Sequence, residues 1–354
     1  MNNKMTRKSV SIGSKLIGEG MPCFISFEPG GTFSDFDAAK IMIEATSASG
    51  ADAVKFQTFL PGDADRIMGR KDITVGFRTN SGKKQELVYD ALKRRELSKE
   101  EWIKLAEFTK QKNLLFITAA YFPETVDILP ELGVDAIKVS KGDINNVLLI
   151  DRIAKTNLPV ILDGREKFED VEKAVKICQE NNNEKIIIMH CPSGYPADDS
   201  GVHLNALSAI REKFPYPVGF ADHSPGDIMN YAAVSMGASM IEKTITADKT
   251  LEQVEHFMSL ELDELKDLVK NIRSIEEAMG NSDILQTSRV EESARRSLVA
   301  KKDIKRGEKI TFELLDFRRP GDMGISCSMG FKIINKIAKN DIPMDTFLQL
   351  DMFE

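Results

Sequence analysis

The stretch ELGVDAIKVSKGDINN, residues 131–146, decides the fold of this 354-residue chain. Its first part ends a helical segment at Gly133, because glycine readily takes the left-handed conformation that closes a helix. The apolar run AIKVSK, residues 136–141, follows. Such a run is typical of a strand that is buried on both faces, as in a parallel sheet. A helix, a glycine and a buried strand therefore form the unit that we look for in the rest of the chain.

Seven further apolar runs of strand length occur along the chain. They lie at residues 22–29, 52–59, 114–122, 159–164, 185–191, 218–224 and 240–246. Segments with helical periodicity separate them, most clearly residues 36–49, 99–112 and 263–279, and Gly50 closes the first of these. Eight strand–helix repeats predict a (β/α)8 TIM barrel. A doubly wound open sheet is the alternative, but the chain has no glycine-rich dinucleotide loop, which favours the barrel.

The pattern changes after Gly280. Residues 281–294 are polar and indicate a linker, whereas residues 295–354 carry short apolar pairs between glycines and charges and indicate a small β-rich domain. The predicted barrel domain is therefore residues 1–280. Residues 289–354 hold 13 Lys and Arg against 11 Asp and Glu, although the whole chain has a net charge of −7. This tail either helps to cover an anionic ligand or is a solvated module used for dimerisation.

Composition excludes several classes of protein. The net charge of −7 argues against a general nucleic-acid binder. The four cysteines contain no CxxC pair, so neither a zinc finger nor a disulfide scaffold is expected. The apolar runs are too short to span a membrane, and the polar start MNNKMTRKSVSIG does not resemble a secretion signal. We expect a cytoplasmic protein.

Active sites of such barrels collect at the carboxyl ends of the strands. Lys55 and Lys138 lie inside apolar strands, where a lysine must be paired or functional. Two cations that converge on a barrel mouth form a site for phosphate or carboxylate. A Schiff-base lysine, as in aldolases, and a structural ion pair are the alternatives. The other strand-end residues of interest are Glu28, Gln57, Tyr121, Lys141, Asp163, Arg165, His190, Asp222, His223, Glu242 and Lys243.

Histidine is scarce, with four in the chain, and His223 is the most informative of them because it ends a strand beside Asp222. It is a candidate metal ligand or acid–base group, or else a hydrogen-bonded structural residue. His190 and Cys191 are neighbours in sequence, so their side chains point to opposite faces of the strand. We therefore expect no catalytic dyad between these two residues.

Taken together, the motifs resemble the sialic acid synthases of the N-acetylneuraminate, legionaminate and pseudaminate type. The motifs are ADAVKFQTF, LKRRELSKEEW, ELGVDAIKVSKGDINN, HCPSGYP, PVGFADHS, GASMIEKTIT and FRRPGDMGIS. The resemblance covers nearly the whole chain. It implies a TIM barrel followed by an antifreeze-like (SAF) domain. It also implies a domain-swapped homodimer in which the tail of one subunit covers the barrel of its partner.

The resemblance also implies an activity. Family members condense phosphoenolpyruvate with an N-acylated hexosamine, with the help of Mn²⁺ or Mg²⁺, to give a nonulosonic acid and phosphate. By this resemblance Lys55 and Lys138 hold the phosphoenolpyruvate, and Glu28 orients sugar hydroxyls. His223 acts at the metal together with Glu242. The substrate-binding positions implied are Gln57, Lys141, Asp143, Asn146, Arg165, Tyr195, Glu255, His256 and Arg319, the last reaching the sugar in the partner's barrel.

The chain departs from the family pattern at several of these positions. The first-strand motif of the family continues into Asn-His-Asn-Gly, whereas this chain reads EPGGTFSDF, and Thr244 replaces the second metal-binding histidine. A threonine hydroxyl is a much weaker metal ligand than imidazole. Lys141 and Arg165 add cations where the family has neutral side chains. Two alternatives to the family reaction therefore stay open: a different aldol-type reaction, and a non-catalytic protein that binds a sugar acid or phosphate.

Overall fold

A computed structural model describes residues 6–164, 167–280 and 293–354 of the chain. The chain divides into two compact units, residues 1–280 and residues 281–354. Residues 281–292 of the predicted linker lie outside the described residues. Each unit is described by itself below.

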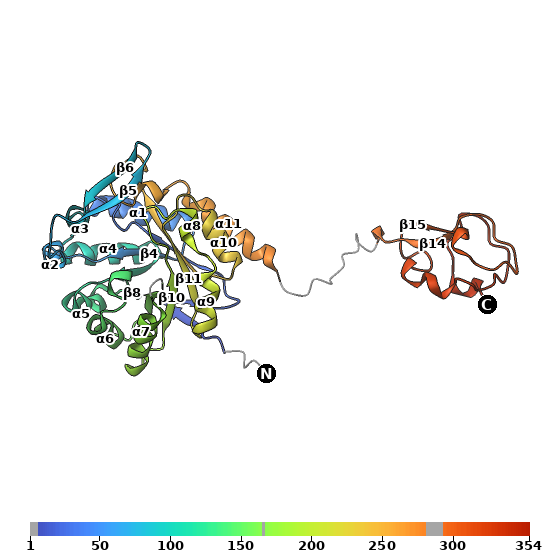
Figure 1. Ribbon diagram of the computed structural model, residues 1–354, viewed down its shortest axis with the longest axis horizontal. Helices are drawn as coiled ribbons and strands as arrows, with labels where there is room; N and C mark the ends of the chain where they lie inside the picture. Colours follow the sequence, from blue (N-terminus) through green and yellow to red (C-terminus); the bar gives the residue numbers. More distant parts are fainter. Residues whose placement is uncertain (1–5, 165–166, 281–292) are drawn as a thin grey trace. The chain divides into compact units, whose positions relative to one another are not determined.

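The first unit is built on a closed barrel of eight parallel strands (Figure 1). The strands are β3 (Phe24–Glu28), β4 (Ala53–Gln57), β7 (Leu115–Ala119), β8 (Ala136–Val139), β9 (Val160–Asp163), β10 (Ile186–His190), β11 (Val218–Asp222) and β12 (Met240–Thr246). They neighbour one another in this order, and pairing of β12 with both β11 and β3 closes the sheet. Each strand falls within one of the eight predicted runs, so the predicted TIM barrel is confirmed.

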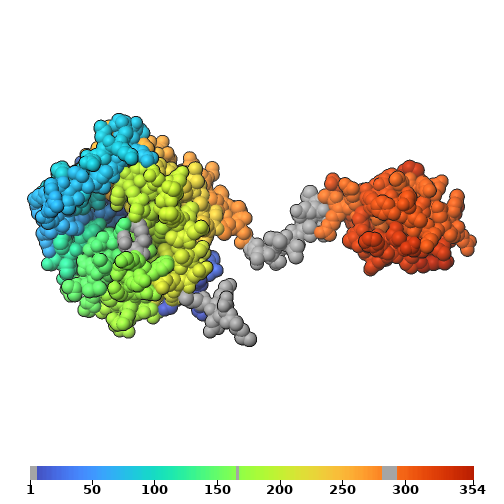
Figure 2. Space-filling model, viewed as in Figure 1, coloured from blue at the N-terminus to red at the C-terminus, as the bar shows by residue number. Residues whose placement is uncertain are grey.

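Helices surround these strands (Figure 1). They are α1 (Phe36–Ser49), α4 (Lys99–Gln111), α5 (Pro123–Leu132), α6 (Val147–Lys155), α7 (Phe168–Glu180), α9 (Ala206–Lys213), α10 (Ile228–Ser235) and α11 (Leu265–Met279). The two predicted helix-closing glycines are confirmed: Gly50 has a φ of 82° and Gly133 a φ of 67°. In the space-filling view of Figure 2, the colours of the barrel unit run around it from blue through green to yellow, in sequence order.

The barrel unit has an outer and an inner apolar core. The outer core lies between strands and helices and contains Phe56, Trp102 and Phe116. The inner core fills the barrel with side chains such as Ile117, Ile161, Ile187, Met189 and Met240. A short hairpin, β1 (Val10–Ile12) and β2 (Lys15–Ile17), adds Val10, Ile12 and Ile17 to the inner core. The amino-terminal hairpin therefore closes one end of the barrel, and the functional site must lie at the other end.

The segment between β4 and α4 covers that other end. It contains α2 (Asp63–Ile67), the hairpin β5 (Thr74–Thr79) and β6 (Gly82–Leu87), and α3 (Val88–Lys93). Phe77 of the hairpin packs with Ala91 and Val254, and Tyr195 lies against this cluster. Apolar contact thus fixes the hairpin to the loops at the carboxyl ends of the strands.

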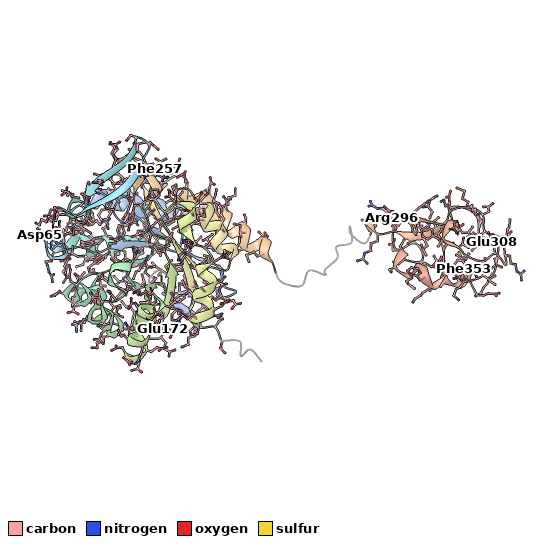
Figure 3. All side chains as sticks on the ribbon, in the orientation of Figure 1. Asp65, Glu172, Phe257, Arg296, Glu308 and Phe353 are labelled. Atoms are coloured by element: carbon pink, nitrogen blue, oxygen red, sulfur yellow. The ribbon has the colours of Figure 1, made fainter. Side chains whose placement is uncertain are left out.

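The second unit has an apolar core of its own. Strands β14 (Ser297–Ala300) and β15 (Leu315–Arg318) pair antiparallel. The 3-10 turn η3 (Phe312–Leu314) lies between them, and η4 (Cys327–Lys332) and η5 (Leu350–Met352) follow. Its core includes Leu298, Ile310, Leu348 and Phe353, the last labelled in Figure 3. No helix among the described residues of either unit is long and apolar enough to cross a membrane.

Candidate active site

Two lysines and two glutamates form a buried charge cluster in the barrel mouth. Lys138 Nζ lies 2.5 Å from Glu242 Oε1, and Lys55 Nζ lies 3.8 Å from the same oxygen. Lys55 also donates a hydrogen bond to Glu28 Oε1. None of the four residues is more than 5% exposed. By contrast, Asp65 and Glu172, labelled in Figure 3, lie at the outer edge of the barrel unit.

Strand alternation decides which lysines reach this cluster. Lys55 and Gln57 on β4, Lys138 on β8 and Glu242 on β12 point into the barrel, because residues two apart share a face. Lys243 points the other way, and its Nζ lies 2.7 Å from Asp222 Oδ2 with both side chains fully buried. Asp222 also accepts hydrogen bonds from Ser224 and Asn230. Asp222 therefore serves a structural ion pair and does not orient His223.

The cluster keeps its lysines charged. Burial alone would lower the pKa of Lys138 and of Lys55, but the neighbouring Glu242 and Glu28 outweigh it and raise both pKa values above the ordinary value. The two carboxylates differ from each other. Burial raises the pKa of Glu242, whereas for Glu28 the same burial is overcome by Lys55 and Lys138, so its pKa is lowered. The barrel mouth therefore presents two ammonium groups.

A hydrogen-bond network extends from the cluster to one side of the mouth. Gln57 Nε2 donates to Glu28 Oε1 at 2.9 Å, and Gln57 Oε1 accepts from Tyr121 Oη at 3.0 Å and from Arg95 Nη1. Arg95 Nη2 lies 3.1 Å from Glu255 Oε1. Glu255 has a φ of 79°, a left-handed conformation that non-glycine residues rarely adopt. Such backbone strain is found where a side chain must be held in one place.

His223 lies on another side of the mouth, between an aromatic ring and a thiol. Its ring centroid is 5.1 Å from that of Tyr195, with the planes 30° apart. Cys191 Sγ lies 3.8 Å from Nε2 and 3.9 Å from Nδ1 of the same ring. His190 instead contacts the carbonyl of Val202 through Nε2. Cys191 therefore contacts His223, a pair that the sequence did not predict.

These side chains line one cavity of about 350 Å³. Most of the predicted site residues line it, namely Glu28, Lys55, Gln57, Lys138, Lys141, Tyr195, His223, Glu242 and Glu255. Arg95, Tyr121, Asp163 and Cys191 line it as well, together with Val75, Val88 and Ala91 of the covering segment. The cavity combines buried cations, carboxylates and amide groups, which suits a small, polar, anionic ligand.

Other predicted site residues lie elsewhere. Asn146 caps α6 by accepting a hydrogen bond from the Leu149 N–H, and its amide donates to Asp143 Oδ1 at 3.1 Å. His256, in η2 (His256–Met258), is buried, and its Nδ1 lies 2.8 Å from Thr246 Oγ1. None of these three residues is among those that line the cavity. Arg165 lies outside the described residues, and Arg319 is an exposed residue of the second unit.

Sequence reasoning did not single out Arg95 as a site residue. It stands within the motif LKRRELSKEEW, but two adjacent arginines in a polar segment give no sign of which one is buried. Only the path of the covering segment places Arg95 beside Gln57 and Glu255. The contact between Cys191 and His223 was missed for a similar reason, because the two residues lie on different strands.

Comparison with known proteins places the chain in a family. The model of the NeuB family matches residues 42–283, and that of the SAF domain matches residues 295–354. The chain belongs to the NeuB family of sialic acid synthases. The N,N'-diacetyllegionaminic acid synthase of Legionella pneumophila is 32% identical over 87% of this chain and 88% of its own. An uncharacterized protein of Methanocaldococcus jannaschii is 34% identical, over 97% of this chain and 98% of its own.

A solved structure agrees with this placement in the NeuB family. The N-acetylneuraminic acid synthetase of Leptospira borgpetersenii, determined in complex with citrate, is 29% identical and superposes with a TM-score of 0.70. The match covers 82% of this chain and 96% of that one. The predicted family, barrel and carboxyl-terminal SAF domain are therefore all confirmed.

The donors expected for Mn²⁺ or Mg²⁺ in this NeuB-family barrel do not fit a metal ion. Within the parts of the chain that the structure describes, no three His, Cys, Asp or Glu side chains are grouped to hold one. Glu242 Oε1 faces the Lys138 ammonium, which repels a cation. Thr244 Oγ1 is buried and has no hydrogen-bond partner within the described part of the chain, and Thr244 is not among the residues that line the cavity. We therefore derive no chemical step through a metal.

Proposed function

We propose that this chain is a transferase that joins phosphoenolpyruvate to an N-acylated hexosamine and releases phosphate, giving a nonulosonic acid. The observation that carries this proposal is the pair of buried ammonium groups, Lys55 and Lys138, at the carboxyl ends of strands in a sialic acid synthase barrel. Phosphoenolpyruvate carries a phosphate and a carboxylate, which are the two groups that such ammonium groups bind.

The proposed reaction uses the cavity in three steps. C3 of phosphoenolpyruvate attacks the aldehyde carbon of the open-chain sugar, the carbonyl π bond breaks, and the aldehyde oxygen takes up a proton. Water then adds to C2 and gives up a proton. Finally the bond between C2 and the phosphate oxygen breaks, the proton of the C2 hydroxyl passes to the departing phosphate, and C2 becomes the keto carbon.

The residues of the chain have roles in binding and in proton transfer. Lys55 and Lys138 exchange their glutamate partners for the anionic groups of phosphoenolpyruvate, so their high pKa values keep the site cationic. His223 lines the cavity, and because an imidazole can both accept and donate a proton we assign it to the transfer of the proton at the aldehyde oxygen. Glu28, which Gln57 continues to hold, faces the acceptor hydroxyls.

The charge state of the lysines favours this reaction over a Schiff-base aldolase. A Schiff base requires an uncharged amine, and burial beside carboxylates keeps Lys138 protonated by raising its pKa. Treatment with pyruvate and borohydride should therefore leave Lys138 unmodified. A covalent adduct found by mass spectrometry at Lys138, or at Lys141, which also lines the cavity, would favour the aldolase.

Phosphate release tests the proposed function. The purified chain is incubated with phosphoenolpyruvate and each member of a panel of N-acylated hexosamines, and phosphate is measured with time. We expect release only when both substrates are present, and none from a Lys138→Met variant that still folds. A chain that releases no phosphate with any member, and whose melting temperature does not respond to phosphoenolpyruvate, would be a non-catalytic relative.

We also propose that the active form is a domain-swapped homodimer. The second unit carries the SAF domain, and in it Arg319 is exposed and available to reach another surface. In this arrangement Arg319 of one subunit contacts the N-acyl group of the sugar bound in the barrel of the other.

A further inference from the structure

The local chain path fixes Arg95 at the barrel mouth. It follows α3, and its backbone N–H donates to the Leu92 carbonyl at 3.0 Å. Two residues later the Leu97 N–H donates to the Phe59 carbonyl, and Glu96 forms an isolated bridge with Phe59. The covering segment therefore returns to the end of β4 at this point and brings Arg95 beside Gln57.

Arg95 is buried and holds two side chains that line the cavity. Its Nη1 donates to Gln57 Oε1, and its Nη2 lies 3.1 Å from Glu255 Oε1, although its side chain is only 7% exposed. Its Nε is buried and has no hydrogen-bond partner among the described residues. A buried guanidinium N–H without a partner is costly, so a ligand oxygen that accepts from it would be favoured.

The glycines of EPGG make room for Arg95. A Cβ at Gly31 would overlap Arg95 Nη2 and would lie 2.9 Å from Cζ. The Gly31 N–H also donates to Glu255 Oε2 at 2.8 Å, so the same backbone holds the partner of Arg95. A Cβ at Gly30 would lie 2.8 Å from Glu255 Oε2. The two glycines and the position of the Arg95 guanidinium thus depend on one another.

We infer that Arg95 is the positioning residue for the acceptor sugar. It fixes the side chains of Gln57 and Glu255 at the wall of the cavity, whereas the task of the lysines is to hold the anion. Its charge is balanced by Glu255, so this side offers hydrogen bonds without net charge. The acceptor it fits is an uncharged N-acylated hexosamine, bound through hydroxyl and amide oxygens. This inference rests on the proposed function.

The test separates binding of the acceptor from binding of phosphoenolpyruvate. KM is measured for each substrate with Arg95→Met, Arg95→Lys and Gly31→Ala, alongside the melting temperature. We expect the KM for the acceptor to rise about 10- to 100-fold in Arg95→Met, the range that loss of a hydrogen bond to a charged group gives. The KM for phosphoenolpyruvate should change less than about twofold in the same variant.

Matched controls exclude a general effect of substitution. Arg94 is adjacent, pairs with Glu86 and is not among the residues that line the cavity, so Arg94→Met should leave the acceptor KM unchanged. A Cβ at the exposed Gly69 would meet nothing within 4 Å, so Gly69→Ala is the control for Gly31→Ala. Gly31→Ala should raise the acceptor KM as Arg95→Met does, because it displaces the guanidinium. Arg95→Lys should raise the acceptor KM less than Arg95→Met does, because it keeps the positive charge.

Three outcomes would overturn the inference while leaving the proposed function standing. They are an unchanged acceptor KM in Arg95→Met, an equal rise in both KM values, and a preference of the wild-type chain for a phosphorylated hexosamine. A wild-type chain that neither binds nor converts any N-acylated hexosamine in calorimetry and phosphate-release assays would overturn the proposed function and this inference together.

Discussion

At the scale of single residues, two buried lysines on different barrel strands, Lys138 on β8 and Lys243 on β12, have different tasks. Lys138 faces the cavity, whereas Lys243 pairs with Asp222 beneath the barrel surface, where both side chains have no exposure. Replacing one partner of a buried ion pair leaves an uncompensated charge. Lys138 is replaced at lower cost, because Glu242 retains Lys55 at 3.8 Å.

We therefore predict that Lys243→Met lowers the free energy of unfolding by about 3–5 kcal/mol. Lys138→Met should lower it by less but abolish the rise in melting temperature that phosphoenolpyruvate causes. Denaturant unfolding and thermal shift measure the two effects. If Lys243→Met unfolds at the same denaturant concentration as the wild type, its ion pair contributes nothing to stability.

Thr244 occupies the position where a second histidine would be needed for a metal site with His223 and Glu242. The register of β11 and β12 pairs Asp222 with Lys243, so the next residues along, His223 and Thr244, lie on neighbouring strands at the same level. A histidine at position 244 would supply a second imidazole beside His223 and Glu242, which is a set that binds Mn²⁺.

We predict that Thr244→His binds Mn²⁺ at least about tenfold more tightly than the wild type, since each added ligand contributes on this scale. Electron paramagnetic resonance of free Mn²⁺ during titration measures the affinity without any need for activity. Thr244→Val is the control and should bind no better than the wild type. Equal affinity in all three chains would mean that position 244 is remote from any metal.

At the scale of the elements, helix ends are set by local chemistry. Gly133 ends α5 with a φ of 67°, and its N–H bonds to the carbonyls of Leu129 and Pro130. A side chain in this conformation costs about 1–2 kcal/mol. A Cβ there would also meet Lys110 Nζ, the flexible end of a side chain that can move at little cost.

We expect Gly133→Ala to lower the free energy of unfolding by about 1 kcal/mol, chiefly through the backbone conformation. Gly69→Ala, at an exposed glycine without a positive φ, should change it by less than about 0.5 kcal/mol. Equilibrium unfolding of the two variants compares them directly. A loss of stability in Gly69→Ala as large as in Gly133→Ala would point to an effect of the added methyl group itself.

The elements were predictable from sequence because their signals are local. Eight apolar runs, the periodicity of residues 36–49 and the glycines that follow helices are read along the chain, and the structure bears each of them out. Lys55 and Lys138 could be chosen because a lysine in an apolar strand is conspicuous. Arg95 could not, since its burial depends on where a segment of nearly forty residues returns to the barrel. Whether His256 lines the cavity likewise depends on the path of the loop after β12, and this path could not be predicted from the sequence.

At the scale of the whole molecule, the proposed swap of tails between subunits can be tested by complementation. A Lys138→Met chain has a defective barrel and an intact tail, and an Arg319→Met chain has the reverse. Coexpression should restore about a quarter of the wild-type activity, because half of the dimers are mixed and each has one intact site. If each barrel used its own tail, the mixture would have no more activity than the two variants alone.

The hairpin of β1 and β2 makes the barrel a blind-ended chamber. Val10, Ile12 and Ile17 pack into the inner core, so no molecule passes out through that end. In the proposed reaction, both substrates and both products would then pass through the one open end, beneath the covering segment. Phosphoenolpyruvate, bound deepest against the lysines, should therefore bind before the sugar in an ordered mechanism.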